Sequence, residues 1–461
     1  MRRRILGLAL LTLTAPLAGQ GFGVNEHGSC MMGRAGAGIA APCADGSGIF
    51  FNPAGIVGHR GFLLSVGVTG IKAFGGFTDD FTQTKTDLAN GIIPVPHVYA
   101  VYGVNDRLAV GAGLFVPYGL GTQWPTTFEG RFNGYDNSLQ TIYLQPTVAY
   151  QATPQFSIGA GFDVALGSLK LTQAVDLSAN PVPGDTTGAT FAQLGIPFHT
   201  GFANALLKGS GTGIGGHLGI RFAPSDRFAI GARYMTRVKV DYTGTVDFSQ
   251  VPTNITLAPY NPLSIALAPT NPLINPANPL PLDVVLSTAF SAGQPLADGA
   301  VATSITMPDQ IVAGIAVRPT ADLMVMVDWQ MVRWSVFDTL AIDFANTATP
   351  DRTLAEGFQD THAIRVGLEW RTSDKFTLRG GGLWHQGAAP DQTVTPLLPE
   401  GDRNEGVIGF GYQLGPTLEV NAAYQYLRQQ KRRGRVQDLP INTGLYEFNA
   451  HLFGLTLTAR F

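Results

Sequence analysis

The sequence predicts an all-β fold, an antiparallel transmembrane β-barrel of about 14 strands with an N-terminal hatch plugging the lumen. Three observations predict this class: long stretches of alternating apolar and polar residues, short turn sequences that alternate with long connections, and an N-terminal segment typical of exported proteins. The net charge of -3 does not provide the strongly basic face that nucleic-acid binding requires, so we expect no nucleic-acid partner.

The N-terminus predicts a signal peptide at residues 1–19. Three arginines at 2–4 precede a short apolar segment at 5–13, and small residues follow up to Gly19, after which we expect cleavage. No later run reaches the roughly 18 apolar residues that a helical membrane span needs. We therefore expect an exported chain in an oxidising compartment rather than a helical membrane protein.

The C-terminal residues 453–461 predict a membrane-spanning strand. Apolar or small side chains recur at every second position up to the terminal Phe461, with Gly, Thr, Thr and Arg between them. A period of two places one set against lipid and the other in a polar lumen. The same alternation runs through 228–240, 364–370 and 418–426. Such stretches often reach the roughly ten residues that a tilted strand needs to cross a bilayer, and strands of soluble sandwiches are shorter.

The connections between these stretches predict the topology. Short turn sequences rich in Asn, Asp, Gly and Pro lie at 105–106, 153–154, 224–226, 319–322, 372–374 and 415–416. Long connections lie between them at 74–96, 117–139, 171–212, 248–303, 346–360, 389–403 and 431–446. Short turns on one side and long loops on the other are typical of an outer-membrane barrel, which we place at residues 61–461.

Residues 20–60 precede the first strand and lack sustained alternation. We expect them to form a hatch inside the barrel, and a flexible periplasmic tail is the alternative. The only two cysteines, Cys30 and Cys43, lie in this segment. In an oxidising compartment a disulfide is favoured over two free thiols, and it would stabilise the hatch by roughly 3 kcal/mol. The neighbouring His27 and His59 supply too few ligands for a metal site, and we expect no metal and no cofactor.

The start of this segment resembles the FadL/TodX family of outer-membrane transporters. The resemblance rests on the ordered set 20–26 (Gln-Gly-Phe-Gly-Val-Asn-Glu), 33–35 (Gly-Arg-Ala) and 52–54 (Asn-Pro-Ala). The corresponding hatch-motif residues are Asn25, Glu26, Gly33, Arg34, Asn52, Pro53 and Ala54.

The resemblance implies a monomeric barrel that moves long-chain fatty acids or aromatic hydrocarbons. The third and fourth long loops would capture the cargo, which would pass to a pocket behind the hatch and leave through a gap at a kinked third strand. Our two longest loops, 171–212 and 248–303, fit this layout. The fourth loop departs from the family in repeating Asn-Pro-Leu at 261–263, 271–273 and 278–280.

We therefore expect an outer-membrane channel for hydrophobic small molecules, with long-chain fatty acids as the preferred cargo. The alternatives are an aromatic hydrocarbon channel and a general diffusion porin, although a porin would have no N-terminal plug. An enzyme is not expected, because no Gly-x-Ser-x-Gly or His-Glu-x-x-His sequence frames the Ser and His residues. Outer-membrane lipid and lipopolysaccharide are the expected surroundings.

Several residues are candidates for contact with the cargo. Four cations on the predicted inward face could pair with a carboxylate or could simply stiffen the lumen: Arg233, Arg237, Lys239 and Arg365. Phe22 and Phe115 are the aromatic candidates, and the family resemblance places Phe22 in the binding pocket.

Two loop features have open alternatives. Apolar residues of the fourth long loop would form either an exposed capture patch or a closed cap: Leu257, Pro259, Tyr260, Pro262, Leu263, Leu267, Leu273 and Ile274. A basic run in the last long loop would contact lipopolysaccharide phosphates or belong to a solvated loop: Lys431, Arg432, Arg433 and Arg435.

Overall fold

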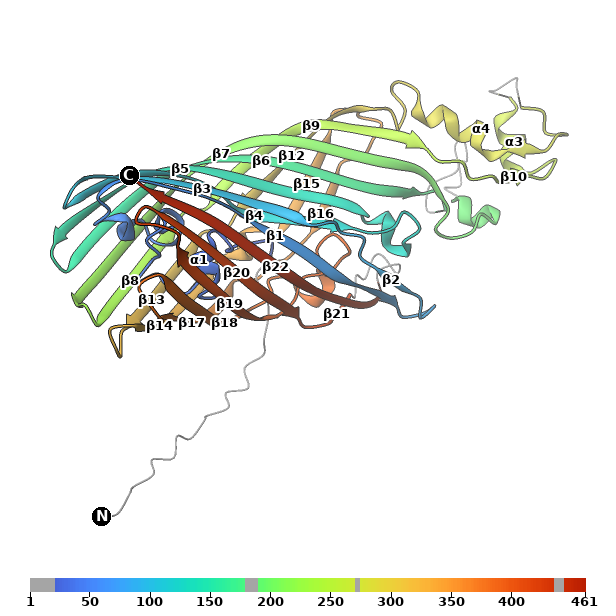
Figure 1. The fold of residues 1–461 in the computed structure, drawn as a ribbon. Helices are drawn as coiled ribbons and strands as arrows, with labels where there is room; N and C mark the ends of the chain where they lie inside the picture. Colours follow the sequence, from blue (N-terminus) through green and yellow to red (C-terminus); the bar gives the residue numbers. More distant parts are fainter. Residues whose placement is uncertain (1–20, 179–189, 270–273, 435–442) are drawn as a thin grey trace, which may run out of the picture.

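The computed structural model describes residues 21–178, 190–269, 274–434 and 443–461. Its strands close into a 14-stranded antiparallel barrel, which confirms the predicted fold class (Figure 1). The predicted signal peptide at 1–19 lies outside the described residues. Within the described ranges, the helices are too short or too polar to serve as membrane spans.

Ten of the wall strands are continuous elements, and four are interrupted along their length. The continuous strands are β1 (Gly61–Asp79), β3 (Ile93–Asn105), β4 (Leu108–Gln123), β5 (Asp136–Thr153), β6 (Phe156–Asp176), β7 (Gly201–Ser225), β18 (Phe376–His385), β19 (Arg403–Gln413), β20 (Leu418–Gln429) and β22 (Gly444–Arg460). The interrupted strands are β8 (Phe228–Met235) with β9 (Val238–Gln250), β12 (Gly299–Met307) with β13 (Gln310–Val317), β14 (Leu323–Val332) with β15 (Thr339–Phe344), and β16 (Arg352–Ala355) with β17 (Thr361–Arg371). The last strand, β22, pairs with β1 from Leu63↔Arg460 to Asp79↔Gly444 and closes the wall.

Shorter elements lie in the loops and in the lumen. Two short strands extend the wall outward, β2 (Lys85–Asp87) and β21 (Arg432–Gly434), and β10 (Thr256–Leu257) pairs with β11 (Leu280–Pro281) in an outer loop. The loop helices are α3 (Pro262–Leu267), α4 (Leu282–Leu286), η2 (Glu129–Phe132), η3 (Phe191–Leu194), η4 (Ser287–Phe290), η5 (Trp334–Val336) and η6 (Asp391–Thr393).

The alternation along the strands has the predicted consequence. On β22, Phe453 is 59% exposed on the outer face, whereas Thr456 and Thr458 are buried on the inner face. The same holds for β17, where Val366 and Leu368 are exposed and Arg365 is buried. The barrel therefore presents an apolar band outward and polar side chains inward, as a protein in lipid requires.

The predicted turns are all tight connections, but the predicted long loops are too wide. The ladder between β6 and β7 continues from Phe156↔Phe222 to Asp176↔Gly201, so the third loop spans only 177–200. At the outer ends of β6 and β7, apolar and polar residues alternate less regularly than in the membrane-spanning parts. The sequence pattern therefore assigned these ends to loops.

The apolar residues of the fourth loop form a cap. Leu263 and Ile274 are buried in a cluster with Leu177, Phe191 and Leu282, which joins the third and fourth loops. Tyr260 is exposed, and Leu273 and the side chain of Leu267 lie outside the described part of the chain. In Figure 1 this cap, with α3 and α4, projects beyond the outer end of the barrel.

Residues 21–60 lie inside the barrel and form the hatch (Figure 1). The hatch contains α1 (Ser29–Met32), α2 (Gly48–Phe51) and η1 (Pro53–Ile56), and a disulfide joins Cys30 to Cys43 with their Cα atoms 6.3 Å apart. The Asn52 side chain accepts the Ala54 N–H at 3.1 Å and donates to the carbonyl of Ile220 on β7 at 3.0 Å. A Cβ on Gly219 would come within 2.1 Å of the Asn52 Oδ1, so glycine allows the hatch to approach this wall.

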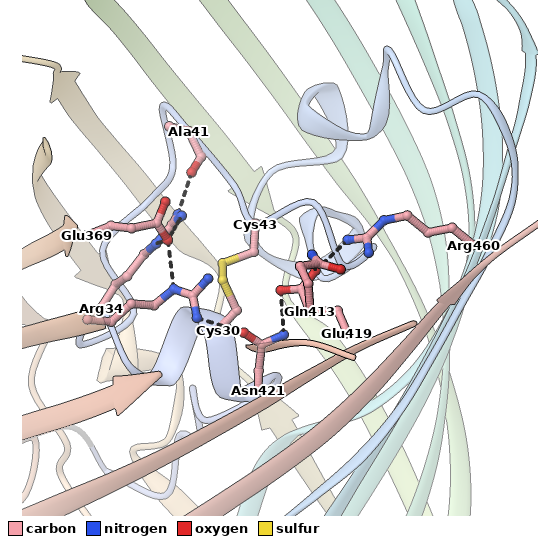
Figure 2. A network of polar contacts seen from close by, with 10 residues as sticks. Cys30, Arg34, Ala41, Cys43, Glu369, Gln413, Glu419, Asn421 and Arg460 are labelled. Carbon is pink, nitrogen blue, oxygen red and sulfur yellow. Dashed lines mark hydrogen bonds and ion pairs between the residues drawn. A yellow bond between two sulfur atoms is a disulfide. The ribbon is translucent and has the colours of Figure 1, made fainter. Parts of the chain in front are cut away.

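Charged side chains also hold the hatch to the wall at β17 and β18 (Figure 2). Glu369 on β17 accepts hydrogen bonds from Arg34 of the hatch and from Arg379 on β18, whose Nε lies 2.7 Å away. Both guanidinium groups are buried, with side-chain exposures of 5% and 6%. Arg379 also donates to Asn421, and Arg460 pairs with Glu419 in the same network. One carboxylate therefore neutralises two buried cations from different elements.

We expect Glu369→Gln to loosen the hatch without unfolding the barrel. Removing the carboxylate leaves two buried guanidinium groups without an ionic partner, which costs about 3–5 kcal/mol. Trypsin cleavage after Arg34 in the folded protein should therefore accelerate by at least about tenfold. Asp322→Asn, which removes an exposed ion pair with Arg371 on the wall, is the control and should leave cleavage unchanged. Equal protection of the hatch in both variants would contradict this account.

Candidate functional site

The wall has a gap between β3 and β4. The ladder between these strands runs from Asn105↔Leu108 to Val98↔Leu114 and stops there. Beyond that point β3 contains Pro94 and Pro96, which have no N–H to donate to a neighbouring strand. At the far end of the gap the Asn90 side chain donates to the carbonyl of Gly121 at 2.8 Å. We call the opening between these two limits the window.

The hatch supplies the backbone partners that β4 lacks beside the window. The pairing of β4 with β5 shifts between Phe115 and Tyr118, so that β4 is irregular there. Val24 of the hatch donates its N–H to the carbonyl of Pro117, and Gly119 donates to the carbonyl of Phe22, both at 2.9 Å. The start of the hatch therefore replaces a missing strand, which satisfies backbone groups that lipid could not.

Three cavities lie in line from the outer loops to the window. The vestibule, about 720 Å³, is lined by the outer parts of β6, β7, β9 and β16. The neck, about 90 Å³, shares Leu171, Leu207 and Leu354 with the vestibule. The window cavity, about 460 Å³, shares Leu120 and Leu139 with the neck and is lined by Pro94 and Gly121 at the window. The three cavities are therefore neighbours that share walls from the vestibule to the window cavity.

Phe22 lies where the neck meets the window cavity and lines both. Its ring packs edge-on against Trp334 at 4.6 Å and against Phe337 at 5.5 Å between ring centroids. On the other side it contacts Tyr118 of β4 at 6.3 Å. The family resemblance placed Phe22 at a binding pocket, and in the structure its ring lies between two cavities.

The cavities carry few charges. Of the described residues lining the neck, only Lys170 and Glu356 are charged, and the Nζ of Lys170 lies 2.5 Å from a carboxylate oxygen of Asp136. Glu356 also lines the vestibule, together with Arg352.

The window cavity is more acidic. Among the described residues that line it, Glu26, Glu400 and Glu405 face one cation, Arg403, whose guanidinium donates to the Gly21 carbonyl at 3.0 Å. A carboxylate cargo would therefore meet cations in the outer cavities and an excess of acid near the window.

Two of the predicted lumen cations point inward but do not line these cavities, and one of them holds the hatch. Arg233 donates to the carbonyl of Phe50 at 2.8 Å and to Gln310 at 2.9 Å, and its guanidinium stacks on the Phe50 ring. Arg365 donates to Gln330 of β14 at 2.6 Å and lies 3.1 Å from the His385 ring of β18, so it links wall strands. Both side chains are buried and point inward as predicted. Their contacts fit the alternative that we kept open, in which these cations stiffen the lumen and do not bind the cargo.

The predicted inward orientation of Arg237 and Lys239 is wrong. The expected continuous strand 228–240 is interrupted between β8 and β9, and this interruption shifts the alternation by one residue. Val238 and Val240 consequently face inward, whereas the side chains of Arg237 and Lys239 are 54% and 61% exposed. Arg237 lies 3.3 Å from Asp309, which lies in the interruption between β12 and β13 of the neighbouring strand.

The remaining candidates belong to the hatch or pack against it. Phe115 is fully buried against Phe50 and His27 and does not line the three cavities. Burial, followed by the nearby His97, lowers the pKa of His27 to about 3, so this histidine is neutral at ordinary pH. Glu26 accepts a hydrogen bond from the Asn25 N–H at 2.9 Å and lines the window cavity.

Sequence reasoning missed the charged residues that line the route. Lys170 lies on a strand end that the pattern assigned partly to a loop, and Glu356 lies in the predicted loop 346–360, where no alternation indicates a direction. Arg403 is the last residue of another predicted loop. Only the alternation within β19, extended backward from its apolar positions, could have indicated that Arg403 points inward.

We expect Phe22→Ala to connect the neck with the window cavity. Truncating this buried ring leaves a cavity between Trp334 and Tyr118 that the rigid wall fills only in part. Single-channel conductance of the protein in a planar bilayer should therefore rise several-fold. Phe81→Ala, at a ring that is 77% exposed on an outer loop, is the control. Unchanged conductance of Phe22→Ala would show that other side chains form the partition.

The sequence is similar to those of known outer-membrane proteins. A family model described as outer membrane protein transport protein (OMPP1/FadL/TodX) matches residues 9–461. A relative from Salmonella typhi, named long-chain fatty acid transport protein, is 25% identical over 473 aligned positions, covering 99% of this chain and 98% of the relative.

Solved structures show the same fold. A Pseudomonas aeruginosa FadL homologue has a TM-score of 0.75 at 22% identity and covers 96% of this chain and 100% of its own. The Pseudomonas putida toluene transporter TodX has a TM-score of 0.69 at 19% identity, with coverages of 95% and 99%. The chain therefore belongs to the OMPP1/FadL/TodX family of outer-membrane transport proteins, which are channels and not enzymes.

Proposed function

We propose that this protein carries hydrophobic small molecules from its outer loops through the vestibule and neck, past Phe22, and sideways through the window into the membrane. The observation that carries the proposal is the line of three cavities that ends at an interruption of the wall. An apolar molecule gains about 25 cal/mol for each Å² that it buries, so a leucine-lined neck suits it.

Long-chain fatty acids are the cargo that we propose first. The relatives named long-chain fatty acid transport protein align along almost their whole length. The outer cavities place Lys170 and Arg352 where a carboxylate headgroup would enter, while the hydrocarbon chain would pass through the leucine-lined neck. A narrow neck and a hatch in the lumen do not suit the free diffusion of hydrated solutes through a porin.

Aromatic hydrocarbons are the second candidate cargo. In the described part of the chain, three glutamates and one arginine line the window cavity, and this balance favours a neutral molecule over an anion at the exit. The structural neighbours include two named toluene transporters.

We also propose that the protein acts as a monomer, because each wall strand pairs with strands of its own chain. Lipid and lipopolysaccharide would surround its outer face. The basic run contributes little to this contact, since Arg432 and Arg433 pair with Asp391 and Asp80, and Lys431 pairs with Glu447. Arg435 lies outside the described residues.

Binding of radiolabelled palmitate to the purified protein, with toluene as competitor, tests the cargo. We expect saturable palmitate binding that toluene displaces only weakly. Stronger binding of toluene would assign the channel to aromatic hydrocarbons. Free passage of sugars through liposomes containing the protein, without binding of either probe, would contradict both and indicate a porin.

We expect Gly121→Leu to block release while leaving capture intact. A Cβ at this position would lie 2.7 Å from the Cδ1 of Ile93, so a leucine side chain would fill the window. Palmitate uptake by cells carrying the variant should fall several-fold, and palmitate binding to the purified variant should be unchanged. Gly406→Leu is the control, because its Cβ would meet open space on the outer face of β19. Undiminished uptake by Gly121→Leu would exclude the window as the exit.

A further inference from the structure

Glu356 occupies a distinctive place on the route. It follows β16 and lines both the vestibule and the neck, so that its side chain borders the passage from one to the other. The other residues lining the neck are mainly leucine, isoleucine and phenylalanine. A molecule that moves from the vestibule towards Phe22 has to pass this carboxyl group.

The backbone holds Glu356 in this position. Its N–H donates to the carbonyl of Asp338 at 2.8 Å, and its own carbonyl accepts the Thr393 hydroxyl at 2.6 Å. Gly357 donates to the same Asp338 carbonyl at 2.9 Å, and Phe358 packs against Phe337 with centroids 5.0 Å apart. Phe337 in turn contacts Phe22. The carboxyl group is therefore attached to the rigid aromatic cluster that divides the route.

The carboxyl group itself has no hydrogen-bond or ionic partner among the described residues. The cations that face the same cavities are Lys170, which is paired with Asp136, and Arg352 on β16. The neighbouring Asp338 is exposed and contributes only its backbone carbonyl. Burial among apolar side chains raises the pKa of Glu356 to about 8.

We propose that Glu356 is a headgroup-binding residue, whose carboxyl O–H donates a hydrogen bond to the carboxylate of a passing fatty acid at the entrance to the neck. This inference rests on the proposed fatty-acid cargo and adds the residue that reads its polar end. An uncharged hydrogen-bond donor can bind an anion without repelling it. It also adds no fixed charge to the apolar neck. A hydrocarbon without a headgroup would gain nothing from this residue.

The sign of the pH dependence follows from this role. Below a pH of about 8 the group keeps its proton and can donate, and above it the group becomes an anion that repels a carboxylate. Affinity for an anionic ligand should therefore be highest in the neutral range and should fall as the pH rises. A hydrogen bond to a charged group is worth enough to change affinity by about tenfold or more.

The test uses hexadecanesulfonate, whose charge does not change in this range, so that any pH dependence comes from the protein. Its binding to the purified full-length protein in nonionic detergent is measured from about pH 6.5 to about pH 9.5. We expect the affinity of the wild-type protein for the sulfonate to fall about tenfold over this range. The affinity of Glu356→Gln should be the same at every pH, because its amide group always donates. Asp343→Leu, which removes an exposed carboxylate from the adjacent β15, should keep the wild-type profile.

The outcomes separate the two proposals. Identical pH profiles for wild type and Glu356→Gln, with both variants binding the sulfonate, would overturn the role of Glu356 and leave the fatty-acid proposal intact. Binding of toluene but of neither palmitate nor the sulfonate would overturn the fatty-acid cargo and the headgroup site together. Retained toluene binding shows that the Glu356→Gln variant is folded.

Discussion

Backbone groups that lie in lipid must find their hydrogen-bond partners within the protein, and this requirement governs the whole structure. The wall satisfies it by closing β22 onto β1. The exception is the window, where β3 and β4 separate and the hatch donates to and accepts from β4 in place of a strand. The window and the hatch therefore depend on each other, since a displaced hatch would leave Pro117 and Gly119 without partners.

The same dependence explains how the charges are distributed. Several charged side chains of the wall hold the hatch: Glu369 and Arg379 form a network with Arg34 of the hatch, and Arg233 donates to the carbonyl of Phe50. Unpaired charges inside the barrel would be unfavourable, so the polar interior is also the attachment surface of the hatch. The route is left with apolar walls and a small number of placed polar groups.

Much of the fold could be predicted because lipid imposes a strict period of two. That period gave the inward direction of Arg233 and Arg365 correctly and placed Phe453 on the outer face. It failed at residue 236, because nothing in the sequence marks the interruption that turns Arg237 and Lys239 outward. The period of two also failed to predict the outer ends of β6 and β7. The ladder between these strands continues above the membrane, where no lipid requires the residues to alternate. The placement of Glu356 and Arg403 depends on packing between distant loops, which no local pattern contains.

The length of the outer strands has a consequence for where capture occurs. β7 has 25 residues and β6 has 21, whereas a membrane span needs about 9–11. At about 3.3 Å per residue, β7 extends roughly 80 Å, far more than the hydrocarbon core of about 30 Å. The vestibule is lined by Val175 and Ala205, near the outer ends of these strands, so it stands clear of the acyl chains. In the proposed route, a hydrophobic molecule enters the protein from solution at the level of the lipopolysaccharide sugars. It then crosses this hydrated layer inside the protein and has no contact with it.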